Sequence, residues 1–222
     1  MVIQVGAILS VIVYFRHRLI PYKENQSHEK KHAIYSLWKK TIVGFIPALV
    51  VGGLLGGYAE ELLFNPLVVS VALLVGGVIL LVIERREGRV RINSINDLDY
   101  RTAFLIGLAQ SVAIVPGTSR SAATIIGAMI LGTSRVVAAE YSFFLAIPTL
   151  TAAAAYLLFK NGLFMPKIEF QVMAIGFFVS FITAWLVIAG FMSYVSRRDF
   201  KPFGYYRIVL GLILLWYFRL IQ

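Results

Sequence analysis

Hydrophobic residues form long unbroken runs along this chain, and the charged residues gather between those runs. Six runs are long enough, or nearly so, for helices that cross a lipid bilayer, which takes about 20 residues. We expect these helices at residues 1–14, 41–58, 66–83, 141–159, 171–195 and 208–220. The first and the last are short for a complete crossing.

Residues 102–132 follow a different pattern, because Pro116 and Gly117 interrupt an apolar stretch. Proline cannot continue the hydrogen bonding of a helix, and glycine permits unusual dihedral angles. The arms on either side have 14 and about 12 residues, too short for full crossings. We therefore predict a re-entrant helical hairpin, since irregular backbone is tolerated at membrane depth where protein or a wet cavity surrounds it.

The composition agrees with a membrane protein. Of 222 residues, 59% are hydrophobic and 14% are charged, whereas soluble domains have roughly 45–50% apolar and about 25% charged residues. We predict an all-α integral membrane protein with six transmembrane helices plus one re-entrant hairpin, in a single polytopic domain spanning residues 1–222. The sequence has no cysteine, which excludes disulfides and thiolate metal sites.

The formal net charge of +10 is concentrated in loops between the predicted helices. Lys and Arg number seven in residues 16–40, five in 84–101 and four in 196–207, against none in 58–65. The three rich loops share one side if the hairpin returns to the side it left. The positive-inside rule makes that side cytoplasmic. The basic charge then sets topology and contacts membrane lipids, and we expect no nucleic-acid partner.

This threading places the hairpin tip toward the outer half of the membrane, with residues 160–167 and both termini outside. Three predicted helices precede the hairpin and three follow it, which indicates two inverted repeats, residues 1–83 and 102–222. The first repeat would then be incomplete, without a hairpin of its own. Because Met1 leads straight into an apolar run, we expect a truncated chain or a misplaced start.

The hairpin tip carries residues suited to binding an anion. Thr118 or Ser119 can cap a new helix, whose N-terminus attracts phosphate. Arg120 adds a planar cation that binds phosphate oxygens in a bidentate way, and Ser119, Ser121 and Thr124 add hydroxyls. An arginine within a membrane span costs about 2.5–3.5 kcal/mol on insertion scales, so it needs a cavity or a partner. The alternative is that Arg120 pairs with a carboxylate or reaches the interface, while the hydroxyls only cap and pack helices.

The stretch "PGTSRSAAT" resembles the P-G-x-S-R-S-x-x-T signature of the bacterial undecaprenyl-diphosphate phosphatase family, the bacitracin-resistance type. "MVIQVGAILSVIVYFRHRL", "YRTAFLIGLAQ" and "AAEYSFFLAIP" are similar to that family too, in the family's order. The resemblance implies an undecaprenyl-diphosphatase at the outer face of the bacterial cytoplasmic membrane. Its substrate would be undecaprenyl diphosphate, and its product would be the lipid carrier of peptidoglycan precursors.

By this resemblance Arg120 is catalytic together with Ser119 and Ser121. The residues implied to bind the diphosphate are Pro116, Gly117, Thr118, Ser119, Arg120, Ser121, Thr124 and Gln110. The family also implies a divalent metal, Mg²⁺ or Ca²⁺, held by an E-x-x-x-E motif that this sequence does not contain. We interpret His17, His28 and His32 as solvated loop residues. Glu60 and Glu61 are adjacent, so they do not face each other on a helix, and no residue is predicted as a metal ligand.

With half of the family's machinery absent, we expect this chain to bind the diphosphate but to hydrolyse it slowly or not at all. A polyprenyl-phosphate transporter or flippase with the same fold is the main alternative, and a non-catalytic scaffold is another. A phosphatidate-type phosphatase is disfavoured because "SRVVAAE" from Ser134 is not followed by a histidine at the required spacing. We interpret Arg135 as an interfacial charge and Glu140 as a pairing residue. A homodimer is compatible with the sequence.

Overall fold

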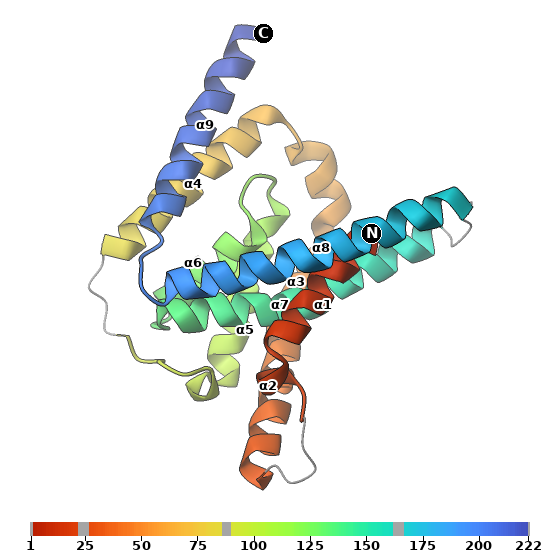
Figure 1. Cartoon of the computed structure of the whole chain (residues 1–222). Coiled ribbons are helices and arrows are strands. Elements are labelled where there is room, and N and C mark those ends of the chain that lie inside the picture. The colour runs from red at the N-terminus through yellow and green to blue at the C-terminus, as the bar shows by residue number, and fades with distance from the viewer. Residues whose placement is uncertain (1, 22–26, 86–89, 162–166, 222) are drawn as a thin grey trace.

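The computed structural model describes residues 2–21, 27–85, 90–161 and 167–221 (Figure 1). In these ranges the regular elements are helices, apart from an isolated bridge between Ile92 and Thr133. Their order is α1 Val2–Tyr14, α2 Arg16–Leu19, α3 His28–Leu63, α4 Pro66–Arg85, η1 Ile95–Asp97, α5 Tyr100–Ser111, η2 Val112–Ile114, α6 Arg120–Ile130, α7 Arg135–Asn161, α8 Lys167–Val195 and α9 Lys201–Ile221. The predicted outer loop at 160–167 and two predicted basic loops fall partly outside the described residues, at 162–166, 22–26 and 86–89.

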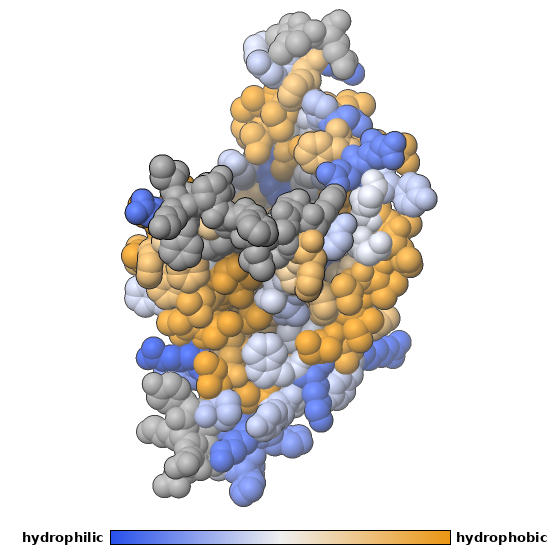
Figure 2. All heavy atoms as spheres, turned by 90° about the vertical axis from the view of Figure 1, so that its right-hand side faces the viewer, coloured by the Kyte–Doolittle hydropathy of each residue, from blue (hydrophilic) through white to orange (hydrophobic). Residues whose placement is uncertain are grey.

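The surface is that of a protein that lies in lipid. Four of the described helices are long and apolar enough to cross a membrane: α3, α4, Arg135–Leu157 of α7 and Gln171–Val195 of α8. Large hydrophobic side chains point outward, and Leu54 and Trp216 are 70% and 68% exposed. Figure 2 shows hydrophobic residues in a broad belt across one face, with strongly hydrophilic residues gathered below it. The all-α membrane class is thus confirmed, while the number of six crossings stays a prediction.

Helix α3 begins well before the predicted start at residue 41, inside the segment that we predicted as a basic loop. Ser27 caps this extension by accepting a hydrogen bond from the Lys30 N–H at 3.4 Å. Ile34 and Leu37 are buried in the extension, whereas most of its charged side chains are exposed. The prediction was wrong because it followed continuous hydrophobicity, and an amphipathic helix that continues beyond the bilayer has none.

Helix α9 also begins earlier than predicted, at Lys201 rather than at residue 208. Arg207, which we assigned to a basic loop, therefore lies inside this helix, and only 7% of it is exposed. A prediction based on hydropathy alone ends an apolar run at an arginine. Here the side chain is buried against α4, so the helix continues through it.

The helices pack in pairs around the hairpin (Figure 1). Helix α1 lies against α8, α4 lies against α9, and the hairpin arms α5 and α6 contact α3 and α7. Gly107 of α5 meets Gly44 of α3 so closely that a side chain on Gly107 would overlap the Gly44 carbonyl. The inner face of the hairpin is buried, with Ala103, Ile106 and Ala128 at 0% exposure. Close backbone approach through glycine is typical of helices packed in membranes.

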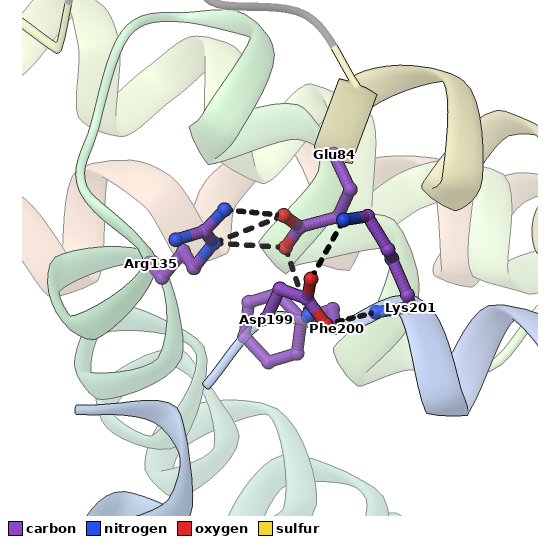
Figure 3. A network of polar contacts seen from close by, with 5 residues as sticks. All are labelled: Glu84, Arg135, Asp199, Phe200 and Lys201. Atoms are coloured by element: carbon purple, nitrogen blue, oxygen red, sulfur yellow. Dashed lines mark hydrogen bonds and ion pairs between the residues drawn. The ribbon is translucent and has the colours of Figure 1, made fainter. Parts of the chain in front are cut away.

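A polar junction ties three distant segments together (Figure 3). The Glu84 carboxylate, at the end of α4, accepts hydrogen bonds from Arg135 Nε at 3.0 Å and Nη2 at 2.6 Å. It also accepts one from the Phe200 N–H at 2.9 Å, just before α9. Asp199 and Lys201 form an adjacent ion pair at 2.9 Å. The junction therefore fixes α4, the start of α7 and the start of α9 relative to one another.

Candidate functional site at the hairpin tip

The two arms of the hairpin start and stop where local rules dictate. The Asp99 side chain caps α5 by accepting a hydrogen bond from the Thr102 N–H at 2.7 Å. Helix α5 ends at Ser111, earlier than the predicted break at Pro116, and the chain tightens into η2. Val115 is extended, with φ −76° and ψ 119°, because a residue before proline avoids the helical region. The turn at residues 115–119 therefore begins one residue before Pro116, and Thr118 closes it with an N–H to Val115 carbonyl bond of 3.2 Å.

Gly117 is required at the tip for two reasons. Its φ of +88° lies in the left-handed region, which side chains disfavour. A Cβ on this residue would also lie 2.5 Å from the Val69 carbonyl oxygen of α4. The tip therefore lies directly against the backbone of α4, and this contact determines the level along α4 that the tip reaches.

Ser119, one of the two residues predicted as a cap, is the residue that caps α6. Its hydroxyl accepts from the Ala122 N–H at 3.4 Å and lies 3.2 Å from the Ser121 hydroxyl. It is also the non-glycine residue with a positive φ, +66°, in the described chain. Such a conformation costs about 1–3 kcal/mol and persists where the surroundings impose it. Both serines are exposed, so their hydroxyls are available to a ligand.

Arg120 carries a charge without a partner in the described part of the chain. Its Nη1 atom is buried and makes no hydrogen bond there, and no described carboxylate forms a salt bridge with it. The alternative in which Arg120 pairs with a carboxylate is therefore not the arrangement seen. A partly buried, unpaired guanidinium beside the N-terminus of α6 is arranged to receive an anion.

Arg207 is a second arginine at the tip, and the sequence analysis missed it. Its Nη2 donates to the Gly117 carbonyl at 3.0 Å and to the Ala72 carbonyl of α4 at 3.3 Å. It reaches the tip through a slot left by Gly76, where a Cβ would lie 2.5 Å from Nη2. The available signal was an arginine inside an apolar stretch, which marks a functional site by default.

Two predicted ligand residues lie beneath the tip rather than at its surface. The Thr124 hydroxyl is fully buried and lies 2.8 Å from the Ser142 hydroxyl of α7. Gln110 is 2% exposed and donates to Thr149 of α7 at 3.2 Å. The structure thus brings Pro116, Gly117, Thr118, Ser119, Arg120 and Ser121 together and directs Thr124 and Gln110 to α7. The direct role of these last two stays a prediction.

Two carboxylates near the start of α7, Glu140 of α7 and Glu84 of α4, pair with arginines as structural groups. Glu140 accepts from Arg18 at 2.6 Å, and Arg135 bonds to Glu84 in the junction. In the described residues no group of three or more His, Asp or Glu side chains could hold a metal ion. The tip offers arginines and hydroxyls, a donor set that suits an anion and does not fit a divalent cation.

A profile described as "Bacitracin resistance protein BacA" matches residues 1–213. The chain belongs to the BacA family. Its BacA relatives include "Undecaprenyl-diphosphatase 1" of Clostridioides difficile (strain 630), 45% identical over 220 residues, which cover 99% of this chain and 80% of the relative. "Undecaprenyl-diphosphatase" of Limosilactobacillus fermentum is 44% identical over 225 residues, covering 99% of this chain and 82% of the relative.

The Enterococcus faecalis "Undecaprenyl-diphosphatase" is 42% identical, and the match covers 96% of this chain and 79% of that BacA relative. The chain therefore spans about four-fifths of the length of these relatives. The matches do not place the remaining fifth, so they do not bear out the expectation of a truncated chain. They do confirm the family that the tip motif indicated.

Proposed function

We propose that this chain is an undecaprenyl-diphosphatase, which hydrolyses undecaprenyl diphosphate to undecaprenyl phosphate and inorganic phosphate. The observation that carries the proposal is the unpaired Nη1 of Arg120 at the hairpin tip. The names of BacA relatives that match nearly the whole chain support the substrate and favour hydrolysis over transport.

In this proposal the tip binds the terminal phosphate with groups from one short segment. Arg120 neutralises negative charge, the hydroxyls of Ser119 and Ser121 donate to phosphate oxygens, and the first N–H groups of α6 complete the cradle. Hydrolysis adds water across the anhydride and breaks one P–O bond, so that phosphate leaves and the lipid monophosphate remains. Phosphoryl transfer depends on positioning and on stabilising charge at the equatorial oxygens, which is what Arg120 supplies.

Arg207 positions the tip in the same proposal. Its bond to the Gly117 carbonyl joins α9 to the turn that precedes Ser119. The bonds it makes go to neutral carbonyls, so its positive charge is not cancelled and adds to the field at the tip. The arrangement thereby places two cationic side chains where a diphosphate brings several negative charges.

The proposed location is the bacterial cytoplasmic membrane, with the tip directed toward the outer half. In Figure 1, α2, the start of α3 and the segment before α5 lie toward one end of the molecule, and the turn between η2 and α6 points away from that end. If that end is cytoplasmic, the lipid monophosphate forms on the outer side, where recycling of the peptidoglycan carrier and bacitracin resistance require it. The Mg²⁺ or Ca²⁺ that the family resemblance implies finds no fitting donor set at the described tip, so no step is assigned to it.

Phosphate release from undecaprenyl diphosphate, measured with the purified chain in detergent, tests this function. Arg120→Gln should lower the rate about 100-fold, the usual effect of losing one donor to a developing anion. Arg197→Gln, which removes an exposed arginine from the basic end, is the matched control and should leave the rate unchanged. Equal rates and equal diphosphate affinity for wild type and Arg120→Gln would contradict the proposal.

The same measurement tests the expectation of weak activity. That expectation stays a prediction, because the relatives' names say nothing of how fast this chain works. A rate equal to that of a full-length BacA relative assayed in parallel would show that it was wrong, while the assignment of Arg120 would stand.

A further inference from the structure

A pocket lies between α1, α2 and α8. Its volume is about 380 Å³, and it is lined by Val13, Tyr14, Arg16, His17, Phe181 and Trp185. None of these residues belongs to the diphosphate site. The pocket therefore needs an explanation of its own.

The pocket exists because α1 and α8 are in contact near Gly6 and separate toward the end of α1. Gly6 of α1 lies directly on the α8 backbone, where a Cβ would be 2.5 Å from the Phe177 carbonyl. Ser180 fixes the same contact by donating to the Ile3 carbonyl at 2.7 Å. Beyond this crossing the two helices diverge (Figure 1). The gap that opens between them toward the end of α1 is the pocket.

The walls of the pocket are apolar. Phe181 and Trp185 are one helical turn apart, so they share a face of α8, and Val13 of α1 stands on the other side. Trp185 is 43% exposed on a surface that faces lipid. A hydrocarbon chain is the occupant that such walls prefer, because lipid surrounds this part of the protein.

The edge of the pocket is cationic. Arg16 and His17 are exposed at the start of α2, and Arg16 Nε donates to His17 Nε2 at 3.4 Å. No carboxylate is among the lining residues, and nearby Arg18 is already paired with Glu140 at 2.6 Å. The pocket also lies at the basic end of the molecule, where anionic lipids gather on the cytoplasmic side. A phosphate beside Arg16 completes the arrangement.

We propose that this pocket binds an anionic phospholipid. The headgroup phosphate contacts Arg16, and an acyl chain lies between Val13 and the aromatic pair Phe181 and Trp185. Basic pockets between membrane helices on the cytoplasmic side select anionic headgroups in this way. The site is separate from the diphosphate site and binds lipid of the surrounding leaflet.

Native mass spectrometry of the purified chain, titrated with phosphatidylglycerol or with phosphatidylcholine of the same acyl chains, tests the proposal. Wild type should bind phosphatidylglycerol more tightly. Arg16→Gln should weaken that binding about fivefold, the effect of one basic residue near an anionic lipid surface, and should remove the preference. Trp185→Ala should weaken the binding of both lipids, because it removes a wall of the pocket.

Arg197→Gln removes the same charge from another exposed position at the basic end and should leave the preference intact. A loss with Arg197→Gln equal to that with Arg16→Gln would overturn the proposal, since the effect would then be one of net charge. Displacement of phosphatidylglycerol by inorganic phosphate would also overturn it, because the site would recognise a free ion. If Arg16→Gln does not fold, unchanged lipid binding by Trp185→Ala would count against the pocket.

Discussion

The two arginines at the hairpin tip are held in different ways. Arg207 donates to two carbonyls through Nη2, although its buried Nε has no partner in the described chain, whereas no hydrogen bond of the Arg120 guanidinium is seen there and its Nη1 is buried. Carbonyl dipoles stabilise a cation without cancelling its charge. The tip is therefore cationic before a ligand arrives, and the anion that binds there supplies the missing partner.

Gly76→Ala should displace Arg207 without unfolding the protein. The added methyl would meet the end of a flexible side chain, at 2.5 Å from Nη2 and 3.1 Å from Cζ, so Arg207 swings away at little cost in stability. We expect phosphate release to fall about 10- to 100-fold, because a misplacement of about 1 Å near a site has effects of that size.

The matched control is Gly52→Ala in α3, where a Cβ would meet nothing within 4 Å. Both changes place alanine inside a helix, and only one touches Arg207. If both variants kept the wild-type rate while staying folded, the slot would have no part in the reaction.

Local rules at single residues predicted much of the tip. Gly117 and the Ser119 cap follow from chain geometry that operates over a few residues. Arg207 could not be placed in this way, because its contact with Gly117 joins residues 90 apart in sequence. Likewise, the burial of Thr124 and Gln110 depends on α7, which the local sequence of the hairpin does not specify.

At the scale of elements, the hairpin is held at its base and at its tip. The junction at Glu84 joins α4 to α7 and α9 at the base, and the contacts of Gly117 join the tip to α4 and α9. The predicted bounds of α4 and α8 agree closely with the structure because their hydrophobic runs end in clear breaks. Those of α3 and α9 do not, because amphipathic and buried-charge segments carry no continuous hydrophobic signal.

Glu84→Gln should destabilise the base of the hairpin. The Glu84 side chain is fully buried, while that of Arg135 is 45% exposed. We expect a loss of about 2 kcal/mol in the free energy of unfolding, less than the 3–5 kcal/mol for breaking a fully buried pair. Thermal unfolding in detergent measures it, with Lys201→Gln as the control, because its exposed pair with Asp199 contributes about 0–1 kcal/mol. Equal losses for the two variants would argue against a special role for the junction.

The cap of α5 predicts a dependence of stability on pH. Hydrogen bonds from Thr102, first from its side chain and then from its backbone N–H, lower the pKa of Asp99. A lowered pKa means that the charged cap stabilises the fold above the unfolded pKa of about 3.9 and that this contribution is lost as the pH falls through the folded pKa. Asp99→Ala should cost about 1 kcal/mol at pH 7.

The difference in stability between wild type and Asp99→Ala should shrink as the pH is lowered below about 4. Asp99→Asn keeps a capping side chain that does not titrate, so it serves as the control. A difference that stayed constant from pH 7 to pH 3 would contradict the role of the ionised carboxylate.

At the scale of the whole molecule, helix pairing supports the proposal of two inverted repeats. If α1, α3 and α4 correspond to α7, α8 and α9, then the pairs α1–α8 and α3–α7 exchange under the repeat symmetry, and α4–α9 maps onto itself. These three pairs are in contact. Composition predicted the membrane class, but which helices meet depends on long-range packing that hydropathy does not encode.

The orientation proposed above can be tested on single-cysteine variants, because the natural sequence has no cysteine. Phe64→Cys lies in the turn between α3 and α4, and Asn93→Cys lies between α4 and α5, both at exposed positions. A membrane-impermeant thiol reagent should label Phe64→Cys in intact cells and Asn93→Cys only after permeabilisation. The cysteine-free wild type is the blank, and the reverse labelling pattern would invert the topology.

The start of α9 contributes to the attachment of the hairpin at its base and at its tip, and this has a consequence for biogenesis. Phe200 completes the Glu84 junction, and Arg207 completes the tip. A nascent chain that has emerged only as far as α8 can form the Glu84–Arg135 bonds and the contact of Gly117 with Val69, but it lacks the bonds from Phe200 and Arg207. We therefore expect the site to reach its final arrangement only after translation has passed residue 207.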